Sequence, residues 1–169
     1  MVANELNKKK YENAVLYFVK YCNNRYLGKT KLNKLMYYLD FISYRDRERS
    51  ITNDKYVHKD YGPVPHSIDD IIMALNKKNQ IDIQFEPWND FLSTKFISRS
   101  DPDVAVFNDY EINLLEKICQ EFQLWSTDKI VNQTHLEGPW FYSKPYEIVD
   151  YNLSDSIDFF RKEEQDVDS

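Results

Sequence analysis

The stretch KTKLNKLMYYLDFISYRDRERSITNDKYVHKDYGPVPH, which spans residues 29–66, decides how the rest of the chain is organised. Its first half predicts a helix over about residues 30–48, because apolar side chains recur on one stripe at the helical period. That stripe consists of Leu32, Leu35, Met36, Leu39 and Ile42. A second, aromatic face consists of Tyr37, Phe41 and Tyr44. Since a helix that is apolar on more than one face is normally buried on several sides, we predict that this helix is the centre of the domain, with Thr30 as its N-cap.

The second half of the stretch ends in the stiff sequence Asp60-Tyr61-Gly62-Pro63-Val64-Pro65. Each proline fixes its own φ angle and pushes the preceding residue towards extended geometry. Gly62 can adopt backbone angles that a side chain would forbid. We therefore predict a preset chain reversal, preceded by a short extended segment over residues 55–61. Ser67 then opens the next helix, and Asp70, three residues later, gives the approximate spacing of a capping box.

The remaining sequence predicts further helices and one hairpin. Apolar periodicity of 3.6 predicts helices over residues 8–25, 68–78, 109–124 and 127–134, and a last helix from Ser154. Asn108 with Glu111 has the spacing of a capping box, and Ser126 is the expected cap of the helix that follows. Apolar residues alternate over 81–86 and 92–96, which predicts an antiparallel hairpin whose loop, 87–90, is longer than the tight two-residue kind.

These elements define the predicted fold class, which is α+β and mainly α-helical. We expect a compact bundle around the central buried helix, about residues 30–48, with a small antiparallel β-hairpin at about residues 80–99. The expected domain organisation is a single domain over residues 1–153, followed by a terminal helix and an acidic, fraying tail over residues 154–169.

The composition indicates a packed globular protein. The chain has 169 residues, enough for one domain that buries about two thirds of its unfolded surface. Its 13 Tyr, 10 Phe and 3 Trp against only 3 Gly favour an ordered core. There is no run of about 18 apolar residues, and the first residues lack the apolar centre of a signal peptide. We therefore expect a cytoplasmic protein with no membrane span, in which Cys22 and Cys119 are reduced, buried thiols.

The net charge of −6 comes from the end of the sequence. Residues 1–145 hold 20 basic and 20 acidic side chains, whereas residues 146–169 hold 8 acidic and 2 basic ones. A neutral body with an acidic tail disfavours sequence-independent binding to phosphate backbones, so we expect nucleic acid not to be the partner. The locally basic area is formed by Lys29, Lys31, Lys34, Arg45, Arg47 and Arg49. It is interpreted either as solvated helix ends or as a patch for an acidic partner.

The reactive side chains do not form a convincing catalytic or metal motif. Cys22, His135 and Asp40 could supply a nucleophile, a base and an orienting carboxylate, but Cys22 lies on the apolar stripe of a helix, where thiols are usually inert. No nucleophile elbow, phosphate loop or dinucleotide fingerprint is present. His58, His66 and His135 are widely spaced, and no Cys or His pair has ligand spacing. We therefore expect no enzyme, no metal and no cofactor, and we expect His58 to be exposed.

Two neighbouring helices, 109–124 and 127–134, could pass as a helix-turn-helix. The second helix offers only Lys129, Asn132 and Gln133 to read bases, and the pair carries several acidic side chains. We favour plain packing of a helical hairpin, and a small DNA-binding regulator stays an alternative.

His135 and Trp140 lie five residues apart across Gly138 and Pro139, which are expected to end the preceding helix. A chain reversal here would bring the imidazole beside the indole, with a ring nitrogen bonded to a backbone carbonyl. We interpret His135 as a satisfied structural histidine, and a contribution to a partner-binding surface is the alternative.

Three groups of residues form a recognisable pattern: Lys34-Leu35-Met36-Tyr37-Tyr38 with Asp40, then Tyr61-Gly62-Pro63-Val64-Pro65, and then Thr134-His135 with Pro139-Trp140. Together they resemble the Panacea domain of the SocA-like antitoxins, a family also known as phage-associated proteins, over roughly residues 8–145. The family-motif or partner-binding residues that the resemblance implies are Lys34, Tyr37, Asp40, Tyr61, Gly62, Pro63, Val64, Pro65, His135 and Trp140.

The resemblance implies an antitoxin of a bacterial or phage toxin–antitoxin system. Proteins with this domain neutralise a cognate protein toxin, usually by direct binding, and some SocA-like members instead deliver the toxin to a bacterial protease. Many relatives carry an added DNA-binding domain, for which we expect no room in this chain. The residues by themselves indicate a helical binding domain, because tyrosine and tryptophan serve interfaces well, and they leave the toxin and the oligomeric state open.

Overall fold

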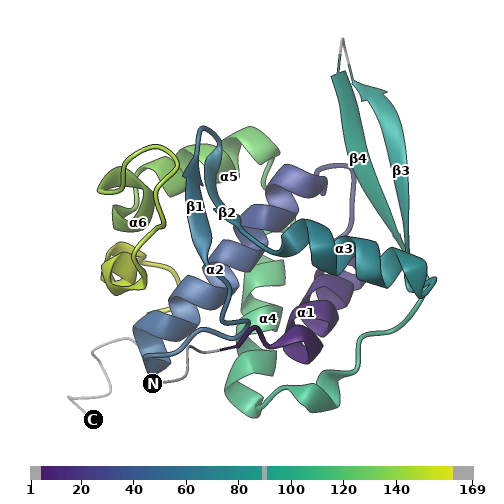
Figure 1. Cartoon of the computed structure of the whole chain (residues 1–169), viewed down its shortest axis with the longest axis horizontal. Coiled ribbons are helices and arrows are strands. Elements are labelled where there is room, and N and C mark those ends of the chain that lie inside the picture. Colours follow the sequence, from purple (N-terminus) through teal and green to yellow (C-terminus); the bar gives the residue numbers. More distant parts are fainter. Residues whose placement is uncertain (1–4, 89–90, 162–169) are drawn as a thin grey trace.

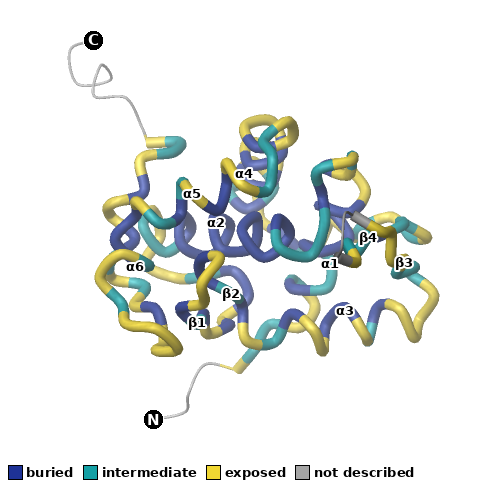
Figure 2. The backbone as a smooth tube through the Cα atoms, turned by 90° about the horizontal axis from the view of Figure 1, so that it is seen from above, coloured by how far each residue is buried: buried dark blue, intermediate teal, exposed yellow. Residues whose placement is uncertain are grey.

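Helix α2 (Lys29–Arg47) runs through the middle of the molecule, as its two apolar faces predict (Figure 1). Every residue over 31–43 is buried, and in Figure 2 this helix is the longest continuous buried stretch of the chain. Helices α1 (Lys8–Tyr21), α4 (Asp109–Phe122) and α5 (Thr127–His135) pack against it. The computed structural model describes residues 5–88 and 91–161. The predicted α+β, mainly helical fold around a central helix is confirmed.

The predicted chain reversal is part of a β-hairpin, in which β1 (Tyr56–Lys59) pairs antiparallel with β2 (Gly62–Pro65). The prediction of an extended segment before the reversal is confirmed, but the two prolines lie inside a strand and not in a turn. They face Tyr56 and His58, whose own backbone groups bond residues 146–149 on the other side of β1. Because alternate residues of a strand direct their N–H groups to opposite sides, the prolines occupy positions where the ladder needs no N–H.

The second hairpin confirms the alternating pattern of the sequence. Strands β3 (Ile81–Trp88) and β4 (Phe91–Ser98) pair in register from Ile81↔Ser98 to Trp88↔Phe91. The prediction of a long loop is wrong, because this register leaves only residues 89–90 between the strands, and these lie outside the described residues. The base of the hairpin packs on α1 and on α3 (Ile68–Lys77), and its far end projects beyond the helices in Figure 1.

Of the predicted side-chain caps, two are confirmed and two are wrong. The capping box of Asn108 and Glu111 is complete in α4, and the Ser126 side chain caps α5 by accepting from the Lys129 N–H. Thr30 lies inside the first turn of α2, where the N-cap is a glycine without a side-chain bond. Ser67 is the N-cap residue of α3, as predicted, but its side chain makes no capping bond, because a buried carboxylate from the loop before β1 accepts its N–H and its hydroxyl.

The chain ends differently from the prediction. Helix α5 ends at His135, before Gly138 and Pro139, as the sequence predicts, and a short helix that it does not predict, α6 (Gly138–Phe141), follows. The α-helix predicted from Ser154 is not formed over residues 154–161; instead a 3₁₀ helix, η2 (Tyr151–Ser156), precedes an irregular segment. A second 3₁₀ turn, η1 (Val104–Val106), leads into α4. Residues 162–169, where the fraying tail is predicted, lie outside the described residues.

The core of the bundle is aromatic as well as aliphatic. Tyr11, Tyr37, Tyr38 and Tyr56 are among the largest fully buried side chains. Cys22 and Cys119 are free and buried, as predicted. None of the helices in the described part of the chain is both long enough and apolar enough to cross a lipid bilayer.

Candidate functional site

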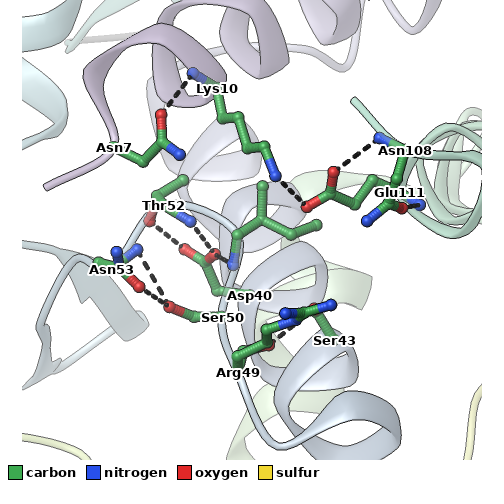
Figure 3. Close-up of polar contacts among 11 residues, drawn as sticks. Asn7, Lys10, Asp40, Ser43, Arg49, Ser50, Thr52, Asn53, Asn108 and Glu111 are labelled. Atoms are coloured by element: carbon green, nitrogen blue, oxygen red, sulfur yellow. Dashed lines mark hydrogen bonds and ion pairs between the residues drawn. The ribbon is translucent and has the colours of Figure 1, made fainter. Parts of the chain in front are cut away.

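Asp40, near the middle of α2, fixes the loop that leads from this helix to β1. Its Oδ1 accepts the N–H groups of Ile51 and Thr52 at 2.8 and 2.9 Å, and its Oδ2 accepts the Thr52 hydroxyl at 2.6 Å (Figure 3). Oδ2 also accepts the Tyr56 hydroxyl at 2.7 Å. Burial raises the pKa of this carboxyl to about 6, and the four donors oppose that rise. The sequence-predicted Asp40 is therefore an internal clamp that sets where the hairpin begins.

Lys34 of α2 fixes β2, the second strand of the hairpin, by a bond to its backbone. Its ammonium is completely buried and donates to the Pro63 carbonyl at 2.8 Å, and burial lowers the pKa of this lysine to about 7. Gly62, with φ of 105°, lies directly against it: a Cβ at this position would be 2.7 Å from Lys34 Cε and 2.6 Å from Thr134 Oγ1. The glycine is thus required twice, by its backbone angle and by the close approach of α2 and α5.

His135 and Trp140 meet as the sequence predicts, and a second histidine joins them. The Trp140 ring is stacked between His135, at 4.0 Å between centroids, and His58, at 4.3 Å. His135 Nε2 lies 3.0 Å from the Asp60 carbonyl, and Trp140 Nε1 donates to the Lys59 carbonyl at 2.8 Å. Because a carbonyl can only accept, His135 carries its proton on Nε2. Both rings therefore hold the turn of the β1–β2 hairpin.

The expected exposure of His58 is wrong. Its side chain is buried under Trp140, with Nδ1 2.7 Å from Ser143 Oγ, and burial lowers its pKa. The Ser143 hydroxyl also donates to the Trp140 carbonyl, so it accepts from His58 Nδ1–H. Strand alternation places His58 on the face opposite to Val57 and Lys59, and this pattern could have predicted its burial. The neighbouring residues are polar, however, so the sequence does not show which face is buried.

Tyr37 takes part in a second buried polar cluster, which lies between α2 and the segment that joins α5 to α6. Tyr37 and its neighbour Tyr38 donate to the two carboxylate oxygens of Glu137 at 3.0 and 3.1 Å, and Gln133 donates at 3.2 Å. Burial raises the pKa of Glu137 to about 7 and raises the pKa of both tyrosines well above the ordinary value. Glu137 was missed from the sequence, because a single glutamate beside Gly138 carries no periodic signal.

The motif residues therefore converge on one structural unit, the β1–β2 hairpin. Helix α2 contributes Lys34 and Asp40, and the segment from α5 to α6 contributes His135 and Trp140. Most of these contacts are made to backbone groups of the hairpin and of the loop before it, so they set its position whatever its side chains are. Tyr37 lies outside this set and bonds the segment between α5 and α6.

The hairpin turn and the segment 136–148, which follows α5, expose six large apolar side chains. We call these residues together the aromatic face: Tyr61, Leu136, Phe141, Tyr142, Tyr146 and Ile148. Tyr61 lies in the hairpin turn and is 69% exposed, whereas Val64 and Pro65 in β2 point partly or wholly inwards. The face makes up half of the exposed large hydrophobic side chains in the described part of the chain. Such clustering is typical of a surface that binds another protein.

The alternative site chemistries find no geometric support. Cys22, His135 and Asp40 each have different hydrogen-bond partners, and Asp40 is completely buried with both oxygens occupied. Among the described residues, no three His, Cys, Asp or Glu side chains are grouped so that they could hold a metal ion.

Half of the basic area expected around α2 is internal. Lys31 and Lys34 are completely buried, and Arg45, with 2% of its side chain exposed, bonds carbonyls near the end of the chain. Arg47 and Arg49 are exposed, and Lys29 pairs with Asp69.

In the candidate helix-turn-helix, Gln133 bonds Glu137 and Lys129 lies 4.0 Å above the Trp125 ring. Two of the three side chains expected to read bases therefore have partners inside the chain.

Comparison with known proteins gives one match. A family model described as the antitoxin SocA-like, Panacea domain matches residues 32–141. The match begins in α2 and ends with α6, so it contains both strands of the β1–β2 hairpin and every motif residue that holds it. No curated protein and no solved structure matches the chain.

Proposed function

Because the chain belongs to the family of SocA-like antitoxins with a Panacea domain, we propose that it is an antitoxin that neutralises a cognate protein toxin by direct binding. The observation that carries this proposal is the family match over residues 32–141, which contains the hairpin and its anchoring residues. An antitoxin of this kind binds its toxin and does not modify it chemically.

We place the toxin on the aromatic face. Aromatic side chains provide a large apolar area with few rotatable bonds, and they dominate the binding energy of protein interfaces. Tyr61, Phe141 and Tyr142 are supported by a rigid base, since the hairpin turn is bonded to His135 and Trp140. A surface that is already fixed loses little conformational entropy on binding, which favours affinity.

The motif residues inside the molecule then act indirectly. Lys34, Tyr37 and Asp40 are completely buried and set the position of the hairpin and of the α5–α6 segment. Replacing one of them should weaken toxin binding through misplacement of the face or through unfolding. Replacing an exposed residue of the face should weaken toxin binding without a loss of stability.

The test is co-expression of the chain with the product of the neighbouring gene, followed by purification. Growth rescue with a stoichiometric complex supports direct neutralisation. The double variant Tyr61→Ala/Tyr142→Ala should lose rescue while keeping its melting temperature. Phe85→Ala is the matched control, because Phe85 is comparably exposed but lies on β3, outside the face.

Two outcomes would contradict the proposal. Rescue that requires a host protease and leaves no stable complex would favour delivery of the toxin to that protease. Full rescue by the folded double variant would remove the aromatic face as the binding surface.

A further inference from the structure

The last described residues lie across one side of the bundle without regular secondary structure. We call residues 157–160 the C-terminal strap. Ile157 is completely buried, and Phe159 and Phe160 are half-buried against the core. Figure 2 shows the last described residues on the side of the body where α4 and α5 lie. The strap lies outside the family match, which ends at residue 141.

Beneath the strap is a second aromatic surface, formed by the family domain itself. Phe159 packs edge-on against Phe122 of α4 at 4.9 Å between centroids, against Tyr38 of α2 at 5.5 Å and against Trp125 at 6.0 Å. Tyr38 and Phe122 are stacked on each other at 4.7 Å. The strap thus covers a continuous aromatic surface that α2 and α4 would otherwise present to solvent.

Arg45 recognises the backbone of the strap. Its Nη1 lies 2.6 Å from the carbonyl oxygens of both Ile157 and Phe159, and 2% of its side chain is exposed. Bonds from a guanidinium to main-chain carbonyls hold the backbone of a segment whatever its side chains are. Side-chain selection comes from the aromatic surface, which contacts the ring of Phe159. Together these contacts hold a short segment whose backbone turns, as the strap does at residues 159–160.

The fit of the strap is imperfect in three respects. Phe160 has φ of 60°, an unfavourable angle for a bulky residue. Arg45 Nη2 is buried and finds no hydrogen-bond partner among the described residues. The carboxylate of Asp158 is close enough to Glu137 to disfavour its ionisation. A segment from another molecule could bind here with a favourable backbone angle, with an acceptor for Arg45 Nη2 and without a carboxylate near Glu137.

We propose that Arg45, Tyr38, Phe122 and Trp125 form a binding site for a short peptide segment with an aromatic anchor, which the strap occupies in cis. The partner is a protein whose exposed segment presents two backbone carbonyls to Arg45 and an aromatic ring to Phe122. Binding of that segment displaces the strap. The site is separate from the aromatic face and does not depend on the antitoxin proposal.

The experiment measures binding of a labelled synthetic peptide, YNLSDSIDFFR, which copies residues 151–161. In the wild-type full-length chain the strap competes with the peptide for the site. The apparent Kd of the peptide therefore equals its intrinsic Kd divided by the fraction of molecules in which the strap has left the site. Phe159→Ala in the full-length chain removes the anchor and keeps the site. We expect this variant to bind the peptide at least about tenfold more tightly than the wild type does.

The controls distinguish binding at this site from nonspecific binding. Phe85→Ala removes an exposed aromatic ring of β3, outside both surfaces, and should leave peptide affinity at the wild-type value. Adding Arg45→Gln to Phe159→Ala should abolish the gain. A scrambled peptide, and a peptide that carries the Phe159→Ala change, should bind at least about tenfold more weakly than the copied sequence.

The proposal is overturned if Phe159→Ala, shown to be folded by circular dichroism, binds the peptide no more tightly than the wild type. Equal binding of the scrambled peptide would overturn it as well. If Phe159→Ala does not fold, Phe159→Leu takes its place, because leucine keeps apolar bulk in the core and loses the aromatic contacts. The same affinity gain is then required.

Discussion

Substituting Gly62 by alanine tests the central structural claim, that α2 and α5 grip the β1–β2 hairpin through a position where no side chain fits. The φ angle of 105° at this residue is one that residues with a Cβ rarely adopt, and holding alanine there costs roughly 1–3 kcal/mol. The added methyl group would also lie 2.6 Å from Thr134 Oγ1 and 2.7 Å from Lys34 Cε. Displacing buried neighbours of this kind costs roughly another 1–3 kcal/mol.

We therefore expect Gly62→Ala to lower the free energy of unfolding by about 2–6 kcal/mol, a large part of the stability of an ordinary domain. For a chain of this size the melting temperature falls by roughly 2–4 °C per kcal/mol. The measurements are urea denaturation and thermal melting followed by circular dichroism. Toxin binding should weaken in parallel, because the hairpin turn carries Tyr61.

Gly28→Ala is the matched control. Gly28 is the N-cap of α2 with φ of −125°, an ordinary angle, and a Cβ there would lie 3.1 Å from the Thr94 carbonyl. This change should cost less than about 1 kcal/mol, since only a small shift of β4 is needed. Thr134→Ala added to Gly62→Ala should restore part of the loss, because it removes one of the two clashing groups. Equal unfolding midpoints for the two glycine variants would refute the reasoning.

Three further predictions follow from the same contacts. Burial raises the pKa of Glu137 to about 7 from an ordinary value of 4.5, so its contribution to stability is full below pH 4.5 and is lost as the pH rises through 7. In the wild type the free energy of unfolding should therefore fall between pH 5 and pH 8, and Glu137→Gln should reduce this fall by about 3 kcal/mol. An unchanged pH profile in the variant would contradict the burial argument. His135→Gln should destabilise by about 1–2 kcal/mol in urea, through loss of the Trp140 stack and of the bond to the Asp60 carbonyl, and an unshifted midpoint would show that the stack contributes nothing. Cys22→Ala should leave the end point of a toxin titration at a fixed molar ratio, whereas complete inactivation at a small fraction of one equivalent, abolished by this change, would indicate catalysis.

The sequence by itself determined the helical framework and several local details. Apolar stripes on two faces were enough to predict that α2 is buried, because such a helix must be covered on several sides. The capping box at Asn108 and the alternation that forms β3 and β4 depend on residues close in sequence, so they could be read directly. The meeting of His135 and Trp140 is also local, since only five residues separate them.

Tertiary structure alone decided the role of polar residues whose partners are distant in sequence. Lys31, Lys34 and Arg45 look like solvated cations on a helix, yet their long side chains reach carbonyls that other segments bring to them. His58 and Glu137 show no pattern of their own, and each is buried because rings from other elements cover it. Backbone carbonyls as acceptors leave no trace in the sequence, because every residue has one.

The same reason explains the two elements that the sequence misjudged. The prolines of β2 suggest a turn, but they fit a strand because the facing residues of β1, Tyr56 and His58, bond residues 146–149 through their backbone groups, a pairing with no local signal. Residues 157–160 show helical spacing of apolar side chains, but Arg45 bonds two of their carbonyls and the aromatic surface contacts Phe159, which favours an irregular, turned backbone. Local periodicity fixes which side chains must be buried, and the partners available in the folded chain decide the backbone that buries them.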